Sequence, residues 1–108
     1  MLTIGATDVK LIEKLLEPYI FTAKEIVEDN IVVLSLDEID LVEYGANKQE
    51  AILNMAKGIL EYAEDFYEDI DYWAVGKRKD HIPYVFKALM LNDVNKIGGL
   101  IKCHPGKI

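Results

Sequence analysis

The side chains best suited to chemistry in this 108-residue chain are carboxylates gathered in one short segment. Four of them share one face of an expected helix, because they are spaced by three and four residues. They are Glu61, Glu64, Asp65 and Glu68. Such a face could hold Mg²⁺ or Ca²⁺ through oxygen ligands, but it has no EF-hand pattern and no Glu-x-x-His pair. We therefore expect a solvated face, with contact to a basic protein and a metal site as alternatives.

The remaining candidates for catalysis are two histidines and one cysteine. His81 and His104 lie in no metal or nucleophile motif, and we interpret both as structural. Cys103 precedes His104, but adjacent residues of an extended segment point to opposite sides, so the two would not pair for nucleophilic catalysis. No serine elbow, P-loop or dinucleotide-binding glycine motif is present. The sequence thus predicts no catalytic residue, no cofactor and no metal, and hence no enzyme.

Two further groups of residues suit contacts with a partner. Tyr72 and Trp73 are large aromatic residues near the end of the expected helix, and such residues are frequent in protein interfaces. Lys77, Arg78 and Lys79 follow in an expected loop and could grip phosphates. The plainer alternatives are packing of the aromatic residues between helices and ordinary solvation of the three cations.

Composition places these residues in one domain. Apolar residues make up 51% of the chain and charged residues 29%, which excludes collagen-like, low-complexity and disordered classes. No apolar run reaches the ~18 residues of a membrane span, and no secretory signal pattern is visible, so we expect a cytoplasmic protein that makes no membrane contact. The single cysteine excludes an internal disulfide.

Charge is distributed unevenly along the chain. Residues 1–72 carry a net charge of −12 and residues 73–108 a net charge of +5, which together give the formal charge of −7. An acidic body suits a basic partner, whereas a basic last third permits contact with nucleic acid or with an acidic surface.

Apolar periodicity predicts a helix followed by strands. Residues 8–17 show helical spacing, and Pro18 ends that helix. Three segments rich in β-branched and aromatic residues then follow with short connections, which predicts an antiparallel meander. They comprise residues 19–28, 31–36 and 39–44.

The apolar period then changes to that of a long helix of about 25 residues. Asn47 can cap its start, with Glu50 at the third helical position. Gly58 within it suggests close packing over the sheet. One apolar stripe follows the steps of three and four, and we expect it to face the core. Its members are Ile52, Met55, Ala56, Ile59, Ala63, Phe66 and Ile70.

The last third of the chain predicts shorter elements. A loop at residues 74–79 leads to a third helix capped by Asp80, and a short helix beginning at Asn92 or Asp93 is interrupted at Gly98-Gly99. A short strand could follow, and we expect residues 104–108 to fray. The apolar stripe expected on the third helix comprises Ile82, Val85, Phe86, Leu89 and Met90.

The middle of the chain contains a sequence pattern typical of one family. Two strands are followed by Gly45, the capping residue Asn47, and a Glu-Ala-Ile tripeptide at residues 50–52 that opens a helix. This order resembles the HicB family of antitoxins over residues 19–70. The resemblance implies a small α/β fold similar to a partial ribonuclease H fold without its catalytic carboxylates. It also implies neutralisation of a small basic mRNA-cleaving toxin, and members often repress their own operon.

We therefore predict a single α/β (α+β) domain over residues 1–108. Residues 19–72 form a HicB-like core, an antiparallel three-stranded meander packed by one long helix, and residues 73–108 form a helical C-terminal extension. In that extension we identify no ribbon-helix-helix or helix-turn-helix DNA reader.

The function predicted for this domain is that of an antitoxin-like protein that occludes the active site of its cognate toxin. The alternative is a DNA-binding regulator that uses Lys77, Arg78 and Lys79, with operator DNA as the ligand. A small metal-dependent enzyme is a third reading, and we expect a homo-oligomer. The predicted partner-binding residues are Glu61, Glu64, Asp65, Glu68, Tyr72 and Trp73.

Overall fold

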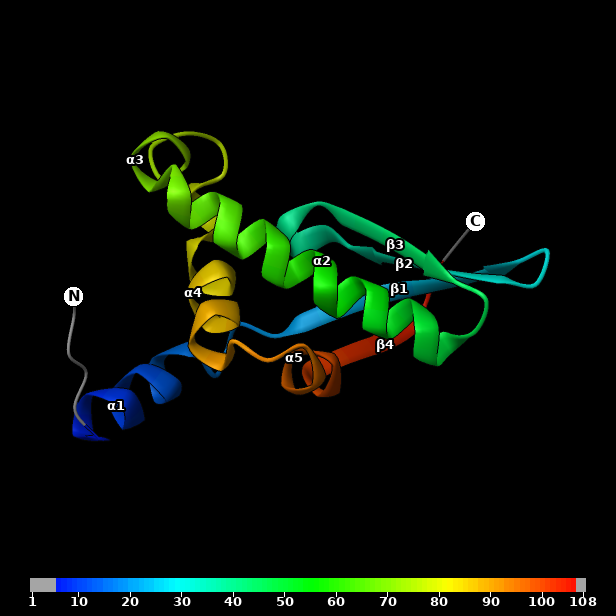
Figure 1. Ribbon diagram of the computed structural model, residues 1–108, viewed down its shortest axis with the longest axis horizontal. Coiled ribbons are helices and arrows are strands. Elements are labelled where there is room, and N and C mark those ends of the chain that lie inside the picture. The colour runs from blue at the N-terminus through cyan, green and yellow to red at the C-terminus, as the bar shows by residue number, and fades with distance from the viewer. Residues whose placement is uncertain (1–5, 107–108) are drawn as a thin grey trace.

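Four strands form one mixed sheet in the part of the chain that the computed structural model describes, residues 6–106 (Figure 1). In space they run in the order β3-β2-β1-β4. β2 pairs antiparallel with both β1 and β3, whereas β4 lies parallel to β1. The strands are β1 (Phe21–Glu28), β2 (Ile31–Leu36), β3 (Leu41–Gly45) and β4 (Ile101–Pro105).

The prediction of a three-stranded sheet is therefore wrong, because the sheet has a fourth strand. β4 supplies the fourth, and its Ile101 pairs with Phe21 far away along the chain. Parallel partners need a long crossover, so no local turn signal marks their pairing. Residues 73–106 accordingly belong to the sheet and its helices and are not a purely helical extension.

The turns between the first three strands use left-handed backbone conformations. Asp29 and Asn30 have φ values of 49° and 64°, and they close the hairpin of β1 and β2 as expected. A short 3₁₀ helix, η1 (Asp37–Ile39), follows β2 and ends at Asp40, which has φ of 55°. Because Ile39 belongs to η1, the third strand starts later than the sequence predicted.

Helix α2 (Lys48–Glu68) crosses the sheet and covers one of its faces (Figure 1). Its start is as predicted, since the Asn47 side chain accepts a hydrogen bond of 2.8 Å from the backbone N–H of Glu50. It has 21 residues and is shorter than expected, because the backbone breaks at Asp69 before a single further turn, α3 (Ile70–Trp73). Its buried residues are Ala51, Met55, Ala56, Ile59, Ala63 and Phe66.

Five of the seven residues predicted for the apolar stripe are buried and form the core together with one face of the sheet. The other two, Ile52 and Ile70, are half-buried and pack against that core, and Ile70 belongs to α3. Phe21, Leu34 and Leu36 are fully buried beneath α2. At one end of this layer the helix approaches very closely, since a Cβ at Gly45 would lie 2.5 Å from the backbone nitrogen of Ala51. Gly58 also lies close to β3, because a Cβ there would be 3.0 Å from Glu43 Oε1.

Two more helices, α4 (Ile82–Leu91) and α5 (Val94–Leu100), pack against α2. Asp93 caps α5 by accepting a 3.0 Å hydrogen bond from Lys96 N. The predicted interruption at Gly98-Gly99 is wrong: α5 continues through both residues. A Cβ at Gly98 would lie 3.5 Å from Ile52 Cγ2, an ordinary van der Waals distance, so α5 lies against α2 at this residue.

Three smaller expectations also differ from the structure. Asp80 does not cap α4, because it lies in a 3₁₀ turn, η2 (Lys79–His81). Phe86 is 40% exposed, and the small residue Ala88 takes the buried position instead. The tail expected to fray is ordered as far as Gly106, whose N–H donates to Glu25 O at 2.8 Å. The remainder, residues 107–108, lies outside the described residues.

Helix α1 (Ala6–Leu16) precedes the sheet and lies at one end of the molecule, beside α4 (Figure 1). It ends before Pro18, as predicted. Lys87 of α4 anchors the connection that follows, because its Nζ donates to Tyr19 O at 2.7 Å. Among the helices of residues 6–106, none combines the length and the apolar character that a bilayer crossing requires.

Candidate partner-binding surfaces

The predicted acidic face lies on the solvent side of α2. All four of its carboxylates are exposed, while Ala63 and Phe66 on the opposite side of the same turns are buried. None of the four forms an ion pair within residues 6–106, and no metal-binding group of three or more side chains gathers in that range. The face is thus an unneutralised anionic surface, formed by Glu61, Glu64, Asp65 and Glu68.

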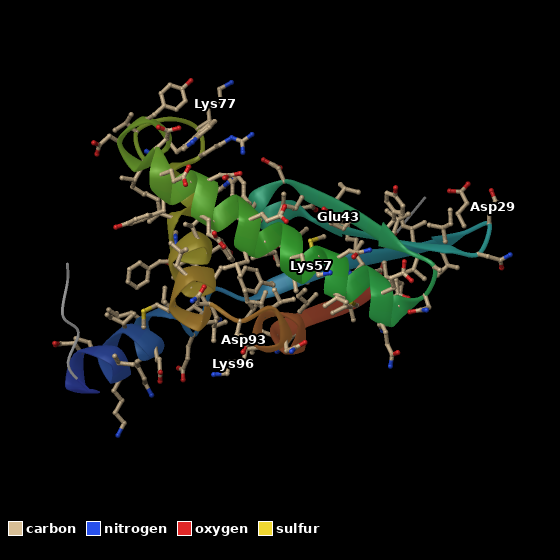
Figure 2. The ribbon with its side chains drawn as sticks, viewed as in Figure 1. Asp29, Glu43, Lys57, Lys77, Asp93 and Lys96 are labelled. Atoms are coloured by element: carbon tan, nitrogen blue, oxygen red, sulfur yellow. The ribbon has the colours of Figure 1, made fainter. Side chains whose placement is uncertain are left out.

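A pocket of about 350 Å³ lies where α3 leads into the following loop, and we refer to it as the α3 pocket. It unites residues that the sequence analysis placed in different groups, the predicted interface aromatics and two of the three predicted phosphate-binding cations. Lys79 is not part of it, because it starts η2. Figure 2 places Lys77 at the end of the molecule opposite Asp29. The pocket is lined by Tyr72, Trp73, Val75, Gly76, Lys77 and Arg78.

Arg78 is held between two aromatic rings at this pocket. Its Cζ lies 5.2 Å from the ring centroid of Trp73 and 5.7 Å from that of Tyr62. Its Nη1 also donates a hydrogen bond of 3.1 Å to Tyr62 Oη. Trp73 in turn stacks on the buried ring of Phe66, with centroids 6.4 Å apart. The pocket floor is therefore anchored to the core.

His81 completes this arrangement from the other side of Tyr62. The hydroxyl oxygen of Tyr62 lies 2.6 Å from Nδ1, and Asp40 Oδ2 lies 3.8 Å from Nε2. A hydroxyl oxygen can accept from Arg78 and still either donate to Nδ1 or accept from it, so the imidazole tautomer sets the direction of this hydrogen bond. Burial is the main cause that lowers the pKa of His81; Arg78 lowers it further, and Asp40 and Asp80 oppose the shift. His81 is thus buried, and its surroundings favour the neutral imidazole.

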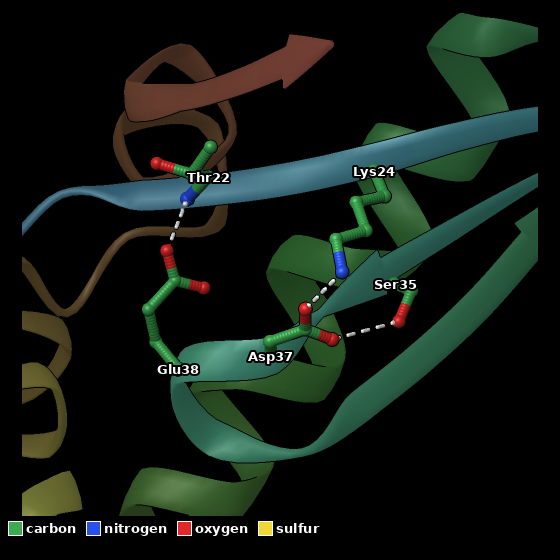
Figure 3. A network of polar contacts seen from close by, with 5 residues as sticks. All are labelled: Thr22, Lys24, Ser35, Asp37 and Glu38. Atoms are coloured by element: carbon green, nitrogen blue, oxygen red, sulfur yellow. Dashed lines mark hydrogen bonds and ion pairs between the residues drawn. The ribbon is translucent and has the colours of Figure 1, made fainter. Parts of the chain in front are cut away.

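A second polar network holds η1 against β1 (Figure 3). Lys24 Nζ lies 2.6 Å from Asp37 Oδ2, and Ser35 Oγ donates to the other oxygen of that carboxylate at 3.4 Å. The hydrogen bond with Lys24 lowers the pKa of Asp37. Glu38 Oε1 accepts from the backbone N–H of Thr22 at 3.1 Å. This hydrogen bond extends the contact with β1 past Leu36, the last residue of β2. These contacts position the turn before β3 and have no catalytic geometry.

Nearly the whole chain matches one family of known proteins. The family model, PHD-like, is described as "Antitoxin of toxin-antitoxin, RelE / RelB, TA system" and matches residues 3–103. The chain belongs to this antitoxin family. The comparison with curated proteins gave no match.

The antitoxin is also similar to a solved structure. This is the crystal structure of an antitoxin part of a proposed toxin/antitoxin system from Syntrophomonas wolfei subsp. wolfei. The sequences are 32% identical, the TM-score is 0.83, and the match covers 90% of this chain and 71% of the other.

Family membership confirms that the chain is an antitoxin of a toxin–antitoxin system, with a cognate toxin as the implied partner. It points to a regulatory role and not to an enzyme. The matching family is not the one that residues 19–70 resemble, so the HicB assignment and the ribonuclease H-like description are unconfirmed.

Cys103 and His104 do not come together in the antitoxin. Cys103 is half-buried and is paired in register with the buried Ala23, whereas His104 is exposed and paired with Lys24. Alternation along β4 thus sends the two side chains to opposite faces, as predicted. Burial is the main cause that raises the pKa of the Cys103 thiol, which disfavours the nucleophilic thiolate.

The outer face of the sheet carries apolar residues that were not predicted as a surface. Ile26, Val33 and Tyr44 form one row across three strands by register, and Tyr44 is 65% exposed. The neighbouring Val42 is exposed on the same face, two residues before Tyr44. The signal was available in β3, where these two apolar residues alternate with residues that face α2.

A second apolar surface was also missed. Phe86 was assigned to the core stripe of its helix, but it lines an exposed pocket of about 290 Å³ between α2 and α4. The apolar spacing predicted Phe86 to be buried. Ala88 is buried instead, and its small side chain contributes little to an apolar pattern. This pocket is lined by Tyr67, Phe86, Leu89 and Met90.

Proposed function

We propose that this antitoxin neutralises a small, basic, mRNA-cleaving toxin by docking the acidic face of α2 over the toxin's active site. The observation that carries the proposal is the exposed row of four carboxylates, none of which is ion-paired within residues 6–106. Like charges three and four residues apart destabilise a helix by a few tenths of a kcal/mol per pair. A basic partner would relieve that repulsion. Membership in an antitoxin family supports the existence of such a partner.

The charged residues and the aromatic residue Tyr72 would contribute differently to toxin binding. The net charge of −7 would attract a basic toxin over about 8 Å at physiological salt and would mainly speed association. The exposed ring of Tyr72, on the turn α3 that follows the acidic face in the chain, would lose water on docking and would slow dissociation. The proposal therefore separates the residues that set the association rate from those that set the dissociation rate.

The first test is co-purification of the antitoxin with the product of the neighbouring gene, followed by kinetics. Reversal of Glu64, Asp65 and Glu68 to lysine should leave the fold intact and slow association at least about tenfold at low salt. Wild-type association should also slow as salt is added.

The matched control for that test reverses three exposed carboxylates elsewhere. The control residues are Glu13 on α1, Glu17 directly after α1, and Glu28 at the end of β1. Their reversal to lysine changes the net charge by the same amount, but away from the acidic face. Association should stay close to the wild-type rate in this control. Equal rates for both triple variants would show that the position of the acidic face is unimportant and would contradict the proposal.

Operator binding is a second proposal that the geometry supports less well. Of the three cations, Arg78 is engaged by Tyr62 and Trp73, and the adjoining helix presents carboxylates that repel phosphates. Steep salt dependence of affinity for the operon's upstream DNA, lost on changing Lys77 and Lys79 to alanine, would favour it. Homo-oligomerisation stays a prediction, which sedimentation velocity would test.

A further inference from the structure

The α3 pocket holds cations that the carboxylates of residues 6–106 leave unpaired. Lys77 and Arg78 form no ion pair within residues 6–106, although Glu68, Asp69 and Asp71 come shortly before them in the chain. The guanidinium group of Arg78 has five N–H donors, and within the same residues its side chain donates one hydrogen bond, to Tyr62 Oη. Donors on this group are therefore left for an external acceptor.

Arg78 is also fixed in place before any ligand arrives. Its guanidinium lies over Trp73 and Tyr62, Trp73 stacks on Phe66, and Tyr62 is hydrogen-bonded to His81. Binding to such a group loses less side-chain entropy than binding to a mobile one. A planar guanidinium with free donors matches the two oxygens of a carboxylate. The site is thus preorganised for one anionic group.

The rest of the pocket is apolar and open. Tyr72 is 71% exposed and Val75 is 81% exposed, so both have apolar surface that a ligand could remove from water. Nothing lies within 4 Å of where a Cβ would stand on Gly76, so this part of the lining is uncrowded. An apolar group placed here would lie next to the guanidinium.

We propose that the α3 pocket binds a protein segment in which one carboxylate stands beside one apolar side chain. The carboxylate accepts hydrogen bonds from Arg78, Lys77 adds a second positive charge, and the apolar side chain packs on Tyr72 and Val75. Assigning that segment to the toxin rests on the function proposed above.

The surroundings of the pocket favour such a segment over a nucleic acid. A nucleic acid strand carries a phosphate at every nucleotide, so it would extend from the pocket along the carboxylates of α2 and be repelled. A protein segment can instead place one carboxylate in the pocket and basic residues over the acidic face. Single-stranded DNA is therefore the comparison ligand in the test.

The first experiment needs no toxin. Trp73 is the only tryptophan of the chain, so its fluorescence reports directly on the pocket. Full-length antitoxin is titrated with N-acetyl-Leu-Glu-amide, with the isosteric N-acetyl-Leu-Gln-amide, and with oligothymidylate. We expect a saturable change with the glutamate peptide and at least about tenfold weaker binding of the other two. Equal titrations with both peptides, or tighter binding of the DNA, would overturn the proposal.

Variants of the antitoxin then test the roles of single side chains. Arg78→Lys keeps the charge but removes the planar fork, and it should weaken the glutamate peptide about tenfold. Lys77→Ala should weaken it less, and Lys96→Ala, which removes the same charge from α5 on another part of the molecule (Figure 2), should have no effect. A thermal melt of each variant shows that the fold is retained. An unchanged affinity in Arg78→Lys would contradict the proposed site.

The second experiment uses the co-purified toxin and separates this inference from the proposed function. If the toxin's segment occupies the pocket, Arg78→Lys speeds its dissociation about tenfold, while association follows the acidic face. A toxin that dissociates from Arg78→Lys as slowly as from wild type leaves the proposed function standing and removes the toxin from the pocket. If no toxin binds the wild type, the proposed function fails. The peptide titration then decides whether the pocket binds a carboxylate beside an apolar side chain.

Discussion

The hydroxyl oxygen of Tyr62 lies 2.6 Å from Nδ1 of His81, and this contact joins the C-terminal half of α2 to the residue that precedes α4. The same oxygen accepts a hydrogen bond from Arg78. One tyrosine hydroxyl therefore connects the buried side of the fold to the α3 pocket, and the state of His81 bears on both.

The first prediction is that the antitoxin loses stability as His81 becomes protonated. Burial lowers the folded-state pKa of His81 below its ordinary value of 6.5, so the unfolded chain binds the proton more readily. Its contribution is complete above about pH 6.5 and is lost as the pH falls from there towards the folded-state pKa. Urea unfolding at pH 7.5 and 5.5 measures this loss.

The variant His81→Gln serves as the reference for that measurement. Glutamine can still accept a hydrogen bond from Tyr62 but does not titrate, so its unfolding free energy should change less between the two pH values. Equal pH dependence of the variant and the wild type would show that other groups cause the loss.

A second prediction concerns the core under α2. Ile59 is 1% exposed, and Ile59→Asp would bury a charge without a partner, at a cost of several kcal/mol. Because a domain is stable by only about 5–15 kcal/mol, this variant should not fold. The neighbouring exposed residues Lys57 and Glu61 should each tolerate alanine within about 0.5 kcal/mol. Circular dichroism melts decide, and a cooperative melt of Ile59→Asp near the wild-type temperature would contradict the assigned core.

Two glycines provide a third, paired prediction. Gly45→Ala would force a Cβ to within 2.5 Å of Ala51 N, so β3 or α2 would have to move, at about 1–3 kcal/mol. Gly76→Ala meets nothing within 4 Å and should change stability by less than about 1 kcal/mol. Denaturant midpoints of the two variants compare them directly. A similar midpoint for both would mean that the close contact between β3 and α2 is easily relieved.

Fourth, we expect the purified antitoxin to have no nuclease, hydrolase or transferase activity. No metal-binding group occurs among residues 6–106. The Tyr62 hydroxyl that contacts His81 is partly buried and already accepts from Arg78, and burial disfavours the Cys103 thiolate. Assays with RNA, with and without added Mg²⁺, should give background rates. A ribonuclease signal that co-elutes with the protein and disappears on changing Asp65 or Glu68 to the amide would show the opposite.

Local signals predicted the parts of the fold that local contacts stabilise. Asn47 caps α2 through Glu50, three residues on, and Asp29-Asn30 closes a hairpin between neighbouring strands. Each of these features depends on a few consecutive residues only. The residues that cause it can therefore be recognised in the sequence.

Contacts between distant segments were less predictable. β4 pairs with β1, with Ile101 opposite Phe21. The residues of β4 predict an extended strand, but they do not indicate which strand it pairs with. The α3 pocket likewise depends on how the chain turns after Trp73, and only that turn brings Lys77 and Arg78 to the aromatic residues. Four of the six lining residues were identified from their chemistry, namely Tyr72, Trp73, Lys77 and Arg78, but their convergence was not predicted.

The parallel pairing of β1 with β4 has a consequence for the chain as it leaves the ribosome. β2 and β3 can join β1 as soon as they are made, but the other edge of β1 has no neighbour until Ile101–Pro105 has been synthesised. At roughly 5–20 residues per second, the intervening stretch takes on the order of 4–15 seconds. During that interval the nascent antitoxin presents an open strand edge that other chains can pair with, so its aggregation risk is greatest before translation of β4.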